Sequence, residues 1–287
     1  MFPENTFQPP PARPSRRHMF SFFEITIIVS IVITLGIILY FRVISPPITS
    51  QQIAQAEDAT SYLQQDSRDT LVALSSASDA NTAAFVNDYT QQANAKLSDA
   101  QKQVNILEKS PVQRNSTVKK SFIAFQAKWG PWSTELQNSA HDIQVSSPVQ
   151  IQLDNNYHAS KAAFKYTAAQ LTAYIPKQLQ QVASYEQQIK TIHPKLAYYQ
   201  QILSAQQTYL QSTSKDWSTA ESQLSSGVPV LTVEKNLQTS ITTTVATIDS
   251  TINTLGNQFE KTQNRLYGGY ALFKFNDSLL QLRSRTP

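Results

Sequence analysis

The hydrophobic residues of this chain form two patterns, one continuous run near the N-terminus and a series of periodic stripes beyond it. The continuous run covers residues 20–41 and contains a single formal charge, Glu24. As a helix rising about 1.5 Å per residue, these 22 residues span roughly 33 Å, enough to cross a hydrocarbon layer of about 30 Å. We therefore predict a transmembrane helix over 19–42.

The flanks of this run predict its orientation. Only Arg42 follows it closely, whereas a cluster of basic residues precedes it: Arg13, Arg16, Arg17 and His18. Because positive charge is retained on the cytoplasmic side, we expect the N-terminus in the cytoplasm and the C-terminal domain outside. A cleaved signal peptide usually has a shorter apolar region of about 7–15 residues, which favours an uncleaved signal anchor and a single-pass protein of the cell membrane.

Beyond Pro46 and Pro47, apolar residues recur at steps of three and four, which is typical of amphipathic helices. The steps predict helices over about 50–108, 118–143, 150–192, 194–227 and 233–266. The first pattern fits either one helix or two helices that meet near Ser75–Asn81. The short segment 270–275, YALFKF, fits a helix or a strand.

Helices with one apolar stripe bury that stripe against one another. We therefore predict an all-α fold, an elongated antiparallel bundle with coiled-coil-like seams. Only 6 glycines are present, which agrees with long helices joined by few turns. The predicted organisation is a disordered cytoplasmic tail over 1–18, the transmembrane helix over 19–42, a linker over 43–50, the helical bundle over 51–267 and a C-terminal tail over 268–287.

One stripe is interrupted by the segment KWGPWS, in which Trp129 and Trp132 flank Pro131. A proline inside a helix removes one backbone donor and predicts a kink. Two interpretations of the tryptophans follow from this position. They form an interaction surface at the kink, or they are part of the bundle core.

The sequence contains no pattern typical of an active site. Cysteine is absent, which excludes disulfides, thiol nucleophiles and thiolate metal sites. The four histidines have no partner at metal-binding spacing, and glycine-rich phosphate loops are missing. Much of the net charge of +4 comes from Arg13, Arg16 and Arg17 before the apolar run, and the remaining charges mix both signs without a basic stripe. We predict that the protein is not an enzyme and has no cofactor, no metal and no nucleic-acid partner.

The residues around Glu24 suggest a family. The segment Phe20-Ser21-Phe22-Phe23-Glu24, after the basic pair Arg16-Arg17, resembles the start of type IV pilin-like proteins, in which a basic leader precedes Phe-Thr-Leu-Ile-Glu and an apolar helix. The resemblance covers 20–40. It implies that Phe20 is the first mature residue and that Glu24 pairs with the N-terminal amine of a neighbouring subunit. Met19, where the family has a small residue, and the all-helical outer region depart from it.

Together these observations favour a membrane-anchored, extracytoplasmic protein of the cell surface that acts in interaction, adhesion or envelope scaffolding. Its partners are the membrane and other proteins, or further copies that associate through helices. Two alternatives remain open: a pilin-like filament subunit, and a ligand-binding or sensor bundle that works with a membrane partner.

Overall fold

The computed structural model describes residues 48–266 and 269–286, and every regular element in these ranges is a helix. The predicted all-α class is therefore confirmed. The elements are α2 (Ser50–Ser78), α3 (Ala83–Lys109), the short 3₁₀ helix η2 (Pro111–Arg114), α4 (Ser116–Ala163), α5 (Ala168–Lys190), α6 (Ala197–Ser225), α7 (Val230–Leu266) and α8 (Gly269–Arg283).

The prediction of a single-pass membrane protein requires correction. No helix in the described ranges is both long enough and apolar enough to cross a membrane. These helices are amphipathic, with an exposed polar face opposite each apolar stripe, whereas a spanning helix is apolar all round. The predicted tail over 1–18 and span over 19–42, with Phe20 and Glu24, lie outside the described residues. We therefore retain the helical bundle and not the predicted membrane location.

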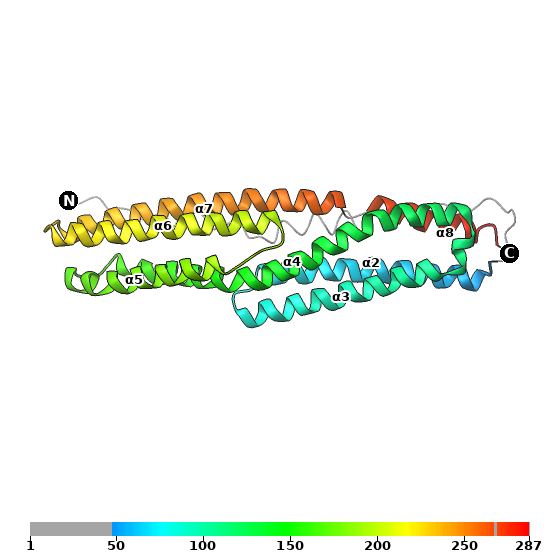
Figure 1. The fold of residues 1–287 in the computed structure, drawn as a ribbon, viewed down its shortest axis with the longest axis horizontal. Helices are drawn as coiled ribbons and strands as arrows, with labels where there is room; N and C mark the ends of the chain where they lie inside the picture. Colours follow the sequence, from blue (N-terminus) through cyan, green and yellow to red (C-terminus); the bar gives the residue numbers. More distant parts are fainter. Residues whose placement is uncertain (1–47, 267–268, 287) are drawn as a thin grey trace, which may run out of the picture.

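The described helices form an elongated molecule made of two bundles placed end to end (Figure 1). The first bundle comprises α2, α3, α8 and the N-terminal half of α4. The second bundle comprises α5, α6, α7 and the C-terminal half of α4. Helix α4 has 48 residues, is about 72 Å long at 1.5 Å per residue, and takes part in both bundles.

The first predicted helical segment is two helices, one of the two arrangements that the sequence left open. Helix α2 ends at Ser78, and α3 begins after Thr82, whose hydroxyl accepts a hydrogen bond from the Phe85 N–H at 3.3 Å. Helix α2 itself begins with a capping box between Thr49 and Gln52. These caps satisfy backbone donors that have no partner within the helix.

Helix α4 differs from the predicted boundaries, because it continues through both Pro131 and Pro148. The two predicted helices over 118–143 and 150–192 are instead divided between 163 and 168. Thr167 and Gln170 form a capping box there and start α5. Each proline removes only one backbone donor, whereas the apolar stripe on either side stays buried, so packing maintains the helix.

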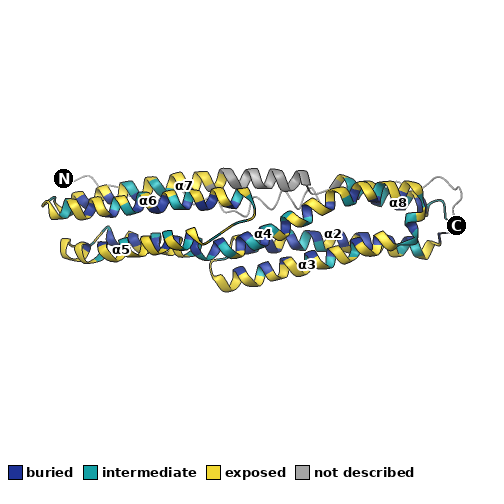
Figure 2. Ribbon diagram, in the orientation of Figure 1, coloured by how far each residue is buried: buried dark blue, intermediate teal, exposed yellow. Residues whose placement is uncertain are grey.

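The segment predicted as a C-terminal tail is α8, which completes the core of the first bundle. Its apolar residues at steps of three and four are buried: Leu272, Phe275, Leu279 and Leu282. The Phe275 ring centroid lies 5.2 Å from that of Phe122 and 6.5 Å from that of Phe125 on α4. The segment 270–275, which the sequence left open between helix and strand, is therefore helical. In a helix, the spacing of its apolar residues lets them pack together against the apolar stripe of α4. Figure 2 shows such buried positions along the inward faces of both bundles.

We expect Phe275→Ala to lower the free energy of unfolding by about 3–5 kcal/mol, because it opens a cavity among aromatic rings. Tyr270→Ala, in the same helix at a side chain that is 72% exposed, is the matched control and should cost less than about 1 kcal/mol. Urea denaturation monitored by circular dichroism measures both. Equal losses in the two variants would mean that α8 does not pack as described.

Candidate functional site

The residues singled out in the sequence lie in different settings. Phe20 and Glu24 are outside the described residues. Trp129 and Trp132 are buried, with 6% and 1% of their surface exposed, and their ring centroids are 5.2 Å apart. The Trp129 indole N–H donates to Gln101 Oε1 at 2.7 Å across to α3. The structure therefore places both tryptophans in the core, and neither offers an exposed interaction surface.

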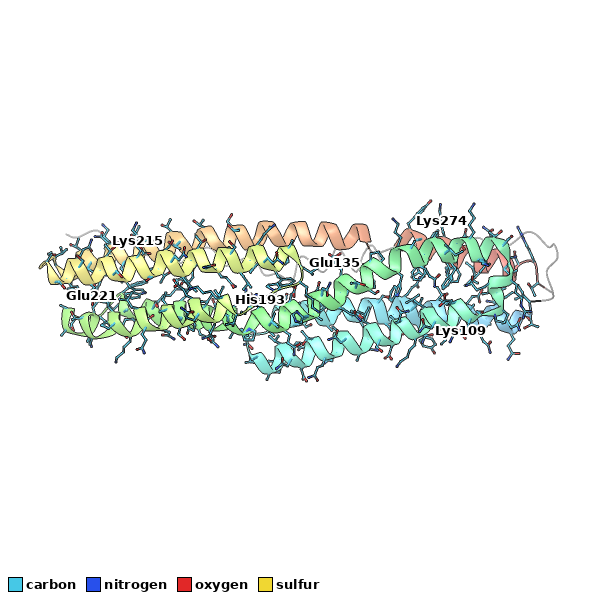
Figure 3. The ribbon with its side chains drawn as sticks, in the orientation of Figure 1. Lys109, Glu135, His193, Lys215, Glu221 and Lys274 are labelled. Carbon is cyan, nitrogen blue, oxygen red and sulfur yellow. The ribbon has the colours of Figure 1, made fainter. Side chains whose placement is uncertain are left out.

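The junction between the two bundles is the most specific polar arrangement in the described structure. Here the loop that joins α5 to α6 contacts the middle of α4. Asp142 on α4 is completely buried and accepts two backbone hydrogen bonds from this loop. The Lys195 N–H donates to Oδ1 at 2.9 Å and the Leu196 N–H donates to Oδ2 at 2.8 Å. Figure 3 shows His193, in the same loop, midway along the molecule.

These hydrogen bonds explain where α6 begins. The residue before the helix, Leu196, has no capping side chain of its own. Asp142 supplies the acceptors instead, from a position more than fifty residues earlier in the chain. Burial of a carboxylate is unfavourable unless its oxygens accept hydrogen bonds, and hydrogen bonds to an ionised acceptor are stronger than neutral ones. The pairing therefore fixes the start of α6 against α4.

His141 adds a titratable group to the junction. Its Nδ1 lies 3.0 Å from Asp142 Oδ1, and its side chain is partly exposed. A carboxylate at Nδ1 orients a histidine in many general bases. Here, however, both carboxylate oxygens already accept backbone N–H groups, and within the described residues no hydroxyl donates to Nε2. The hydrogen bonds at this carboxylate hold the loop against α4.

Apolar packing closes the junction around this polar pair. Tyr199 and Ile202, in the first turns of α6, belong to the same core cluster as the aromatic residues of the first bundle. Burial raises the pKa of the Tyr199 hydroxyl well above its ordinary value, so this side chain stays protonated. The hydrophobic core is therefore continuous from the first bundle into the beginning of the second.

The second bundle has a more polar core than the first. Asn156 Nδ2 donates to Gln178 Oε1 at 3.1 Å, and both side chains are buried between α4 and α5. Between α6 and α7, the Ser240 hydroxyl donates to Asp216 Oδ1 at 2.7 Å. Burial raises the pKa of the Asp216 carboxyl, and the hydrogen bond from Ser240 partly offsets this shift. Such pairs specify helix register while adding little net stability.

Other features of the described residues are less specific. A polar groove of about 540 Å³ lies between α3 and α4 and is lined by Asn94, Leu97, Ser98, Gln101, Lys102, Asn105, Ser133 and Gln137. No group of three His, Asp or Glu side chains in the described ranges is placed to hold a metal ion. The predicted absence of catalysis and cofactors stays a prediction.

Fold and junction together define an all-α protein of two end-to-end helical bundles. Comparison with protein-family models, curated proteins and solved structures finds no match to this chain.

Asp142 was missed in the sequence. One feature of the sequence could have indicated its burial: it is an acidic residue between Ala140 and Ile143, which belong to the inward-facing apolar stripe of α4. Its partners are backbone groups of a distant loop, and no side-chain pattern marks them.

We expect Asp142→Ala to lower the free energy of unfolding by roughly 2–4 kcal/mol, because it leaves the partly buried N–H groups of Lys195 and Leu196 without their acceptor. Asp154→Ala, at an exposed residue of the same helix, is the control and should change stability by less than about 0.5 kcal/mol. Chemical denaturation of the two variants provides the comparison. A loss in Asp142→Ala no greater than in the control would show that the junction does not depend on this carboxylate.

We expect Asp216→Asn to stabilise the protein at pH 7. A raised pKa in the folded state means that the ionised form of Asp216 opposes folding once the pH exceeds the ordinary carboxyl value of about 3.9. The advantage of asparagine should shrink as the pH falls towards that value, where both states bind the proton. Thermal unfolding of both proteins between pH 4 and pH 7 tests this, and an advantage that grows on acidification would contradict it.

Proposed function

We propose that this protein is a non-catalytic helical scaffold, a stiff rod that holds bound proteins at a fixed separation along its length. The observation that carries the proposal is the passage of α4 through both bundles, with Asp142 holding the loop of the second bundle at the border. A ligand site needs a concave pocket, whereas a spacer needs length and resistance to bending. The length of α4 and its passage through both bundles support the second requirement.

Two features oppose bending at the border between the bundles. Helix α4 continues across it and lacks only the backbone donor of Pro148 there, so a bend requires rupture of the remaining backbone hydrogen bonds. The core cluster that includes Tyr199 and Ile202 also crosses the border, so a bend exposes apolar surface. The two bundles should therefore move as one body.

The pilin-like filament alternative stays a prediction, since Phe20 and Glu24 lie outside the described residues. The ligand-binding alternative also stays a prediction. It is supported by the polar core of the second bundle around Asn156 and Gln178.

Three exposed residues mark the rod for distance measurements: Lys109 at one end, His193 at the junction and Glu221 at the other end (Figure 3). The chain contains no cysteine, so Lys109→Cys, His193→Cys and Glu221→Cys can be labelled in pairs without background. For a stiff rod, the end-to-end distance should be close to the sum of the two half distances, and all three distributions should be narrow. Pulsed electron paramagnetic resonance of dilute protein measures them.

The control for this experiment is the junction itself. Adding Asp142→Ala should broaden the end-to-end distribution, whereas Asp154→Ala should leave it unchanged. A broad end-to-end distribution in the otherwise unchanged protein, or one much shorter than the sum of the halves, would rule out a stiff spacer.

A further inference from the structure

Charge is separated between two sides of the first bundle. Residues 48–95, in α2 and the start of α3, contain six acidic residues and one basic residue. Residues 116–134, at the start of α4, contain three basic residues and no acidic residue. Figure 1 places α4 and α8 along one side of this bundle and α2 and α3 along the other. The side formed by α2 and α3 is therefore net acidic, although Lys96, Lys102 and Lys109 on α3 offset part of its negative charge, and the side formed by the start of α4 is basic.

The basic side carries an exposed stripe along α4. We define the basic stripe as residues on one outward face at alternating steps of four and three, all of them exposed: Ser116, Lys120, Ile123, Ala127, Gly130 and Thr134. Lys119 and Lys128 flank it. Ile123 is 54% exposed at its centre. Within the described residues, no carboxylate forms an ion pair with these three lysines.

The acidic side carries a stripe of the same spacing along α2. We define the acidic stripe as Asp58, Tyr62, Gln65, Asp69, Val72 and Ser76. Tyr62 and Val72 are 57% and 50% exposed. Asp69 contacts Lys96 Nζ at 3.5 Å but keeps part of its surface accessible, and Asp58 forms no ion pair within the described residues. Each stripe thus combines apolar residues with charges of one sign.

We propose that the partner of the basic stripe is the acidic stripe of a second copy of this chain. Alternating steps of three and four are the spacing by which helices pack side by side in coiled coils, and flanking charges select the pairing. Of the seven large apolar residues found exposed in the described structure, six lie on the first bundle. Three of these six, Tyr62, Val72 and Ile123, lie in the two stripes.

The geometry also predicts how many copies associate. The two stripes lie on opposite sides of one bundle, so the contact joins two different surfaces. Such a heterologous contact leaves one stripe free on each end copy and allows further copies to add. The expected assembly is a row of parallel or antiparallel rods. This inference deepens the proposed scaffold function, on which it rests, by naming the protein that the rod binds.

A polyanion such as nucleic acid fits the surface less well. It would bind the basic stripe alone, and the acidic side of the same bundle would oppose its approach. It would also leave the exposed Tyr62 and Val72 on α2 without a role. A second copy of the chain accounts for both stripes.

Sedimentation of the full chain at increasing concentration is the first test. The average mass should rise above the 32.1 kDa of one chain and return towards it in about 1 M salt, where the screening length falls to roughly 3 Å. A mass that stays at one chain up to roughly 1 mM would overturn the inference. So would binding of duplex DNA by the basic stripe without self-association.

Charge reversal with complementation is the decisive test. The variant Lys119→Glu/Lys120→Glu/Lys128→Glu should not self-associate, and neither should Asp58→Lys/Asp69→Lys. An equimolar mixture of the two variants should associate again, because the first variant keeps the acidic stripe and the second keeps the basic stripe. This recovery also shows that both variants are folded. The matched control reverses three exposed lysines of the second bundle, Lys165→Glu/Lys177→Glu/Lys190→Glu, and should associate like the unchanged protein.

Two outcomes separate this inference from the scaffold proposal. If both variants lose association and the mixture does not recover it, or if the second-bundle control fails equally, the two stripes are not partners. The distance measurements on dilute protein are independent of association. A stiff monomer without self-association would overturn only the present inference, and a flexible monomer would overturn the scaffold.

Discussion

The described structure depends on one buried carboxylate. Asp142 accepts the N–H groups of Lys195 and Leu196, and these two hydrogen bonds join the middle of α4 to the start of α6. Without them the buried Asp142 side chain would keep only its contact with His141, and the loop would have two unpaired donors. Because α4 is shared and α6 is fixed to it, the two bundles form one rod.

The two halves of the rod are stabilised differently. The first bundle encloses aromatic rings from α4 and α8, including Phe122 and Phe275, whose burial removes much apolar surface from water. The second encloses paired amides such as Asn156 and Gln178, which contribute more to register than to stability. We therefore expect the second bundle to open locally before the first does.

The surface of the first bundle connects this architecture to a function. Charges of both signs are mixed along the chain, which hides the separation between the acidic stripe on α2 and the basic stripe on α4. No basic stripe is evident in the sequence for this reason. Folding places the two stripes on opposite sides of one bundle, where a stiff rod can present both to other rods at once.

The sequence alone determined the helical class, because apolar steps of three and four allow no other regular structure. It also indicated the apolar stripes of the helices, but it left Trp129 and Trp132 open between core and surface, and only the structure placed them in the core. The prediction from the sequence was wrong where tertiary packing outweighed a local preference. Proline disfavours the interior of a helix, yet Pro131 and Pro148 both lie inside α4. The segment predicted as a C-terminal tail is the helix α8. Only the tertiary structure decided the continuity of α4, the place of α8 in the core and the role of Asp142, because each depends on groups that are distant in the sequence and meet only after folding.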